Sequence, residues 1–162
     1  MKNNCPARIQ TSFLKNAMIS VLAGGCFMAG ATPVIAQTKP DATLAAAARE
    51  PGAKVTASGL VIRITKEGTG NQPTTASTVK VHYKGTFPDG KEFDSSYKRG
   101  EPVEFPLTGV IKCWTEGVAL MKVGGKAKLT CPSSIAYGAS GAGGVIPPNA
   151  TLVFEVELLG VR

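Results

Sequence analysis

The residue types that most often bind metals or act as nucleophiles are scarce in this sequence. Its 162 residues include four cysteines, at positions 5, 26, 113 and 131, and one histidine, His82. The cysteines form no CxxC pair and no zinc-ligand spacing with the histidine, which nearly excludes a zinc site. A Ser-His-Asp or Cys-His catalytic group would depend on His82 alone.

His82 falls in a run of alternating apolar and polar residues from position 79 to 84. This period of two predicts a half-buried strand, with the histidine on the polar face between Lys80 and Lys84. No acid or nucleophile stands at a useful local spacing from it. We therefore interpret His82 as a surface residue and expect a site without a metal or another cofactor.

Other segments predict the scaffold around this strand. Residues 126–131 and 152–158 repeat the alternation, whereas Trp114 and Val118 recur at helical spacing within residues 112–121. The 19 glycines and 11 prolines are too many for a helical bundle and fit a turn-rich chain of strands. The predicted fold is α+β, with one short helix against a twisted antiparallel sheet.

A long loop is predicted over residues 137–149, which are rich in glycine and contain the pair Pro147-Pro148. Loops of this length in a small domain are more often functional than idle. Tyr137 stands directly before the glycines, where a structural tyrosine has less to pack on. This residue is therefore a candidate for a functional role.

The first 36 residues have the order of a secretory signal peptide. Three basic residues and no acidic one are followed by an apolar stretch over 17–31 and by small residues up to Ala36. The apolar stretch is too short and too rich in glycine for a good membrane anchor. We expect cleavage after Ala36 and export, with the periplasm as the compartment. Anchoring as a lipoprotein through Cys26 is the weaker alternative, because Leu22 lies one position too far upstream.

Removal of the signal peptide changes the charge of the protein. The whole chain has 18 Lys+Arg against 11 Asp+Glu, a formal net charge of +7, and loss of three basic residues leaves 15 against 11, or +4. The remaining lysines are interleaved with acidic residues and form no basic block. Nucleic acid is therefore not an expected partner.

Residues 37–58 are predicted to be a flexible tether. They contain an alanine-rich patch and the pair Pro51-Gly52, and a helix of two turns is marginal in isolation. The segment lacks the long 3.5-residue apolar repeat of a dimerising helix, so we expect a monomer. The predicted organisation is a signal peptide over 1–36, the tether over 37–58 and a globular domain over 59–162.

Several blocks between residues 57 and 162 form a recognisable set: 81–96 (VHYKGTFPDGKEFDSS), 109–111 with 114–117, 136–138, and 146–158. They resemble the FKBP-type peptidyl-prolyl cis-trans isomerases. They occur in the family's order and at its spacing, which makes the resemblance far more specific than one short motif. It implies a strongly bent antiparallel sheet wrapped around one short helix, with a shallow apolar pocket between them, in an exported bacterial member.

The resemblance also implies the residues of the pocket. The indole of Trp114 would form the floor under the prolyl ring, and the Ile111 N–H and the Tyr137 hydroxyl would donate hydrogen bonds to carbonyl groups. The catalytic set implied is Tyr83, Phe93, Asp94, Ile111, Trp114, Tyr137 and Phe154, and the substrate-binding set is Phe105, Val110, Val145 and Ile146.

The implied reaction is rotation about X-Pro bonds of unfolded or partly folded exported polypeptides. Rotation breaks amide resonance but needs no nucleophile and no net proton transfer, so an apolar pocket that desolvates the amide and binds its twisted form suffices. A binding module or holdase chaperone that grips proline-containing segments without turnover is the alternative. A purely structural β domain is a third possibility.

Some of these residues also have purely structural interpretations. Trp114 and Phe154 would be core residues in almost any small α+β domain. Asp94 could satisfy a buried Tyr83 phenol or pair with Arg99 instead of acting on substrate.

The sequence departs from the familiar family pattern at three places. Val103 replaces an aromatic residue on the pocket rim, and the loop before Val110, residues 106–109, is shorter. The loop tip at 142–145 lacks the His-Pro seen in some relatives. The resemblance implies FK506- or rapamycin-like macrolides as ligands, and these departures concern their affinity more than catalysis.

Two cysteines remain after removal of the signal peptide. Cys131 faces inward on its predicted strand, and Cys113 begins the helix that covers the sheet. A disulfide between them would join helix to sheet in an oxidising compartment. Two buried free thiols are the alternative.

Overall fold

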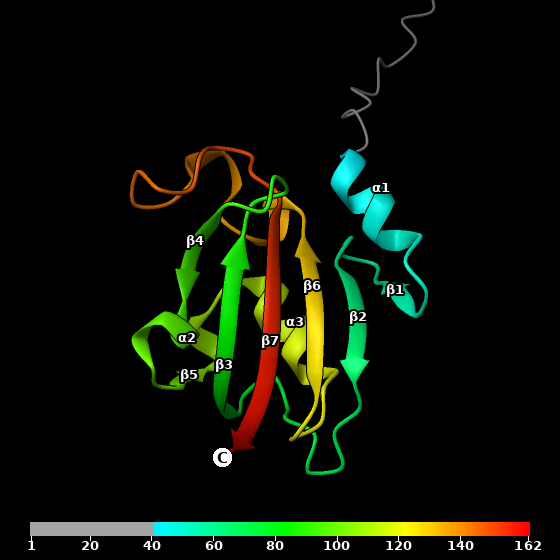
Figure 1. The fold of residues 1–162 in the computed structure, drawn as a ribbon, viewed down its shortest axis with the longest axis vertical. Helices are drawn as coiled ribbons and strands as arrows, with labels where there is room; N and C mark the ends of the chain where they lie inside the picture. The colour runs from blue at the N-terminus through cyan, green and yellow to red at the C-terminus, as the bar shows by residue number, and fades with distance from the viewer. Residues whose placement is uncertain (1–40) are drawn as a thin grey trace, which may run out of the picture. The chain divides into compact units, whose positions relative to one another are not determined.

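The structure is a computed structural model, and it describes residues 41–162. One antiparallel sheet organises this part of the chain (Figure 1). The strand order is β1-β2-β6-β7-β3-β4, and β5 also pairs with β3. The strands are β1 (Ala53–Val55), β2 (Val61–Lys66), β3 (Thr78–Thr86), β4 (Glu92–Ser95), β5 (Val103–Pro106), β6 (Lys126–Cys131) and β7 (Leu152–Val161). The helices are α1 (Ala42–Ala48), α2 (Ser96–Arg99) and α3 (Lys112–Ala119), with short 3-10 turns at Leu107–Gly109, Ser133–Ile135 and Gly138–Ser140. The predicted α+β fold is confirmed.

The two central strands, β3 and β7, show the predicted alternation. Val81 and Tyr83 of β3 are buried and pair with Leu158 and Val156 of β7, which are also buried. Because successive side chains of a strand point to opposite faces, this register gives the sheet one apolar face. The residues between them, including His82, belong to the charged outer face.

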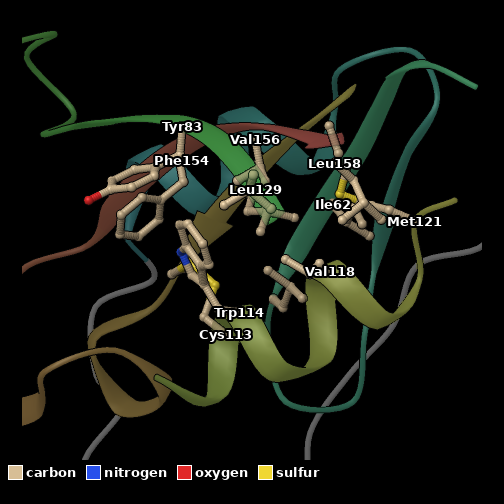
Figure 2. Packing of buried hydrophobic residues seen from close by; sticks show 14 of the residues in the cluster. Ile62, Tyr83, Cys113, Trp114, Val118, Met121, Leu129, Phe154, Val156 and Leu158 are labelled. Carbon is tan, nitrogen blue, oxygen red and sulfur yellow. A yellow bond between two sulfur atoms is a disulfide. The ribbon is translucent and has the colours of Figure 1, made fainter. Parts of the chain in front are cut away.

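Helix α3 packs on the apolar face of the sheet. Figure 2 shows Trp114, Val118 and Met121 turned toward the buried side chains of the strands. Gly117 allows the close approach, since a Cβ atom at this position would lie 2.8 Å from Leu129 Cδ2. A residue with poor helix propensity therefore stands in α3 for a packing reason.

A disulfide joins Cys113, in the first turn of α3, to Cys131 at the end of β6. Both cysteines are fully buried, and their Cα atoms are 5.8 Å apart, a usual distance for such a bond. The bond connects the helix to the sheet directly beside Trp114. The position of this indole is therefore covalently restrained.

The structure corrects the sequence prediction for the segment before the globular domain. Residues 41–58 are not a flexible tether, because α1 buries Ala47 and β1 extends the sheet by pairing with β2. The Glu50 carboxylate also forms ion pairs with Arg63 at 2.8 Å and Lys128 at 2.6 Å. These partners are distant in sequence, so a local pattern could not reveal them.

The predicted signal peptide, its cleavage site and residues 37–40 lie outside the described residues. Among residues 41–162, no helix combines the length and the hydropathy required to cross a bilayer.

The disulfide yields a prediction for the chain that begins at Gln37. Titration of thiols under denaturing, non-reducing conditions should detect no free cysteine, and reduction should release two. The Cys113→Ala/Cys131→Ala variant should lose about 3 kcal/mol of unfolding free energy in chemical denaturation, because the unfolded chain gains loop entropy. Two free thiols before reduction would contradict the disulfide.

Candidate active site

An apolar pocket of about 300 Å³ opens between α3 and the strands β3, β4, β5 and β7. Every implied catalytic residue contributes to it, together with two of the four implied substrate-binding residues. Its lining residues are Tyr83, Phe93, Asp94, Phe105, Gly109, Val110, Ile111, Trp114, Tyr137 and Phe154.

Trp114 is the centre of the pocket's aromatic packing. Its indole makes edge-to-face contacts with Tyr83, Phe105 and Phe154, at centroid distances of 5.1, 5.8 and 5.5 Å. Figure 2 shows the rings of Tyr83 and Phe154 close to the indole. Such pairs stabilise each other beyond simple burial, by about 0.5–1.5 kcal/mol. The rings of three strands and one helix therefore hold one another in fixed orientations.

Phe93 forms a further wall, and Gly85 makes room for it. The Phe93 ring packs edge-to-face on Phe154 at 5.7 Å. A Cβ atom on Gly85 would lie 2.6 Å from the end of the Phe93 ring. Sequence reasoning did not single out Gly85, although a glycine inside an alternating strand pattern signals close approach.

A polar network occupies one side of the rim. The Tyr83 hydroxyl donates to Asp94, and Arg99 pairs with Asp94 at 2.5 Å and donates to the Tyr83 oxygen at 3.1 Å. The Arg99 guanidinium also lies 5.6 Å from the centroid of the Tyr83 ring. Both structural interpretations of Asp94 thus hold together, because the carboxylate satisfies the phenol and the arginine at once.

The network shifts the pKa values of its members. Burial acts to raise the pKa of Asp94, but the hydrogen bonds from Tyr83 and Arg99 outweigh it and leave this pKa lowered. Burial, followed by the bond to Asp94, raises the pKa of Tyr83. At neutral pH the rim therefore carries an ionised Asp94 and a neutral phenol.

Two donors remain at the pocket. Ile111 is the N-cap of α3, and the backbone N–H groups at a helix N-terminus have no acceptor within the helix. Tyr137 directly precedes the Gly138–Ser140 turn, and the residue is 38% exposed. Both residues line the pocket.

The structure does not bring Val145 and Ile146 into the lining. A bridge between Ala142 and Ile146 closes the loop tip, with the Ile146 N–H donating to the Ala142 oxygen at 2.9 Å. This turn directs Ile146 into the core, where it is 8% exposed, and leaves Val145 58% exposed. The sequence analysis also omitted Gly109, although this residue lies in a matching block.

A larger hollow, of about 770 Å³, lies on the outer face of the sheet. Ion pairs line it, including Lys126 with Glu157 at 3.0 Å and Lys84 with Glu155 at 3.6 Å. Its charged groups are already paired, whereas the apolar pocket is lined by aromatic rings and by two residues that carry donors, Ile111 and Tyr137. The apolar pocket is therefore the candidate site.

The fold and the pocket define an α+β domain with an apolar pocket of a size that suits a small apolar group. The family model described as FKBP-type peptidyl-prolyl cis-trans isomerase matches residues 69–159. The chain is 60% identical over 103 residues to FK506-binding protein 1 of Dictyostelium discoideum, covering 62% of this chain and 96% of that protein. It therefore belongs to the family of FKBP-type peptidyl-prolyl cis-trans isomerases.

Longer bacterial relatives also match. The chain is 55% identical over 115 residues to the FKBP-type peptidyl-prolyl cis-trans isomerase FkpA of Escherichia coli strain K12, covering 71% of this chain and 42% of that protein. The crystal structure of FkpA from Escherichia coli has a TM-score of 0.71 and 52% identity, covering 74% of this chain and 55% of that chain. The chain thus spans about half the length of these relatives.

The rim network predicts how Asp94 titrates. Tyr83→Phe keeps the ring but removes the phenol donor, so the pKa of Asp94 should rise toward its ordinary value of 3.8. Because the folded pKa is lowered, ionised Asp94 stabilises the native state above the unfolded pKa, and this contribution is lost as pH falls through the folded pKa. Tyr83→Phe should therefore weaken the loss of stability below about pH 4.

Carbon-13 NMR titration of the Asp94 carboxyl measures this pKa directly. Tyr97→Phe is a matched control, because Tyr97 donates its hydroxyl to Glu157 on the outer face. An unchanged Asp94 titration in Tyr83→Phe, or an equal shift in both variants, would show that the phenol does not hold the carboxylate.

Proposed function

We propose that this chain is an exported peptidyl-prolyl cis-trans isomerase that acts on X-Pro bonds of unfolded or partly folded exported polypeptides. One observation carries the proposal: six of the ten residues that line the pocket are aromatic, and Asp94 is the one charged residue among them. Membership of the isomerase family supports the reaction. Export is supported by the signal-like order of residues 1–36.

The prolyl ring would lie against Trp114, with Phe93 and Phe154 on either side. This arrangement would remove the amide bond before proline from water. In the planar ground state the amide is strongly polarised by resonance, whereas in the twisted transition state the carbonyl dipole is weaker and the need for water is smaller. An apolar pocket therefore favours the twisted form, provided that it binds this form more tightly.

Hydrogen bonds would hold the peptide while the bond rotates. The Ile111 N–H and the Tyr137 hydroxyl would donate to carbonyl groups that flank the proline, and both residues line the pocket. The barrier without catalysis is about 18–20 kcal/mol. A preference of about 5–8 kcal/mol for the twisted form would accelerate rotation by roughly 10⁴- to 10⁶-fold. Shape complementarity to the twisted form, desolvation of the amide and two hydrogen bonds can together supply a preference of this size.

The roles of the individual pocket residues follow from their positions. Asp94 and Arg99 are bonded to Tyr83 and to each other, so we assign them to holding the Tyr83 wall rather than to proton transfer. Phe105 and Val110 extend the apolar surface for residues beside the proline. The exposed Val145 would contact substrate outside the pocket, and Ile146 would support the loop from within the core.

A protease-coupled assay on Xaa-Pro-Phe peptides tests the activity. Phe93→Ala should lower kcat/KM by about tenfold or more, since each 1.36 kcal/mol of lost transition-state binding is about tenfold in rate. Tyr137→Phe should lower it by about three- to tenfold, the value of one hydrogen bond. The control Tyr97→Phe should leave kcat/KM unchanged, because Tyr97 lies on the outer face. An uncatalysed rate with the folded protein would refute the proposal.

A holdase chaperone is the second candidate, and the exposed Tyr137 and Val145 beside the pocket favour it. If the protein also holds unfolded clients, Phe93→Ala should still suppress the aggregation of a reduced, unfolded client while its isomerase activity is low. Light scattering measures this suppression. Loss of both activities together would show that any holding of clients depends on the same pocket as catalysis.

Macrolide binding is a further part of the proposal. The Dictyostelium discoideum relative is named FK506-binding protein 1, and the aromatic pocket of this chain suits an apolar ring of a macrolide. Val103 replaces an aromatic contact on the rim, so we propose weaker binding than that of members with an aromatic residue there.

A further inference from the structure

The segment before β2 makes a contact that the pocket and the core do not require. Asp41 is the N-cap of α1 and accepts a hydrogen bond from the Thr43 N–H at 2.9 Å through one carboxylate oxygen. Its other oxygen accepts a hydrogen bond from the Thr151 hydroxyl, 110 positions away in sequence. One side chain therefore caps a helix and binds the far end of the domain at the same time.

The other end of α1 is also anchored. Glu50 follows the helix and pairs with Arg63 of β2 and Lys128 of β6. Between the two ends, Ala47 is buried against the sheet. The segment is therefore fixed, and Asp41 is held in place beside Thr151.

Thr151 occupies the junction between the long loop and β7. It is 6% exposed, and the pocket wall Phe154 follows three residues later. On the loop side, the Asn149 N–H donates to the Gly138 oxygen at 2.8 Å, and Asn149 has a positive φ of 58°. Gly138 is bonded covalently to Tyr137, so a short chain of contacts connects Thr151 to the donor on the rim.

We propose that Asp41 is a positioning residue for the substrate loop: its bond to Thr151 fixes the base of residues 137–150 and thereby the Tyr137 hydroxyl. The inference rests on the proposed isomerase function for its kinetic consequence. Asp41 does not line the pocket. It acts indirectly, by holding the loop that carries Tyr137, and its effect is therefore on substrate binding. Asp41 belongs to residues 37–58, which were predicted from the sequence to be a tether.

Thr151→Val is the sharpest test, because valine keeps the shape and removes only the hydroxyl. It should raise KM for a proline peptide by about three- to tenfold, which lies within the usual range for coupling through a contact network. It should change kcat by less than about twofold. Thr151→Ser, which retains the hydroxyl, should restore the wild-type KM. Asp41→Ala combined with Thr151→Val should raise KM no further than Thr151→Val alone.

Two controls separate positioning from loss of stability. Thr130→Val replaces another buried threonine on the neighbouring strand and should leave KM unchanged. Lys126→Gln removes the ion pair with Glu157 on the outer face and should lower the denaturation midpoint without a comparable change in KM. A rise in KM in either control equal to that in Thr151→Val would overturn the proposal.

Hydrogen exchange gives a readout that does not depend on catalysis. The Asn149 amide should exchange faster in Thr151→Val than in the wild type and in Thr130→Val, because its bond to Gly138 is loosened. Unchanged exchange at Asn149 would overturn the inference even if the wild-type protein shows no isomerase activity. An active wild type with unchanged KM in Thr151→Val would overturn the inference and leave the proposed function intact.

Discussion

The packing of Trp114 between helix and sheet is the constraint on which the site depends. The indole reaches the sheet only because Gly117 lets α3 approach Leu129 and because a disulfide fixes the residue before it. Once the indole is placed, rings from β3, β5 and β7 can meet its edges and faces at near-perpendicular angles. The pocket is thus an exposed part of the hydrophobic core rather than a separate structure, and its stability and its shape have the same origin.

Charge is distributed so that this apolar surface stays free of it. On the outer face of the sheet, lysines pair with glutamates across neighbouring strands, as Lys126 does with Glu157. Near the pocket, Asp94 and Arg99 are paired with each other and with a phenol. A substrate that enters the pocket therefore meets fixed dipoles and two hydrogen-bond donors, but no unpaired carboxylate.

The parts of this structure that could be predicted are those encoded by local periodicity or by spaced family blocks. The alternation around Val81 predicts β3, and the spacing of Trp114 and Val118 predicts α3, because burial imposes these periods directly. The convergence of Phe93 and Phe154 has no local signal and came from the resemblance alone. The contacts of Asp41 and Glu50 were missed, since a capping side chain or an ion pair has no period and its partner can stand anywhere in the chain. The orientation of Val145 depends on a loop bridge that composition does not encode.

The order of the strands has a consequence for how the protein is made. β7 pairs with β3 on one side and β6 on the other, yet it follows every other strand of the sheet in the chain (Figure 1). During synthesis the two halves of the sheet therefore have no shared strand until β7 has left the ribosome. Pairs such as β2 with β6 and β3 with β5 can form earlier, but the sheet and the core it covers are completed only when almost all of the domain has been translated.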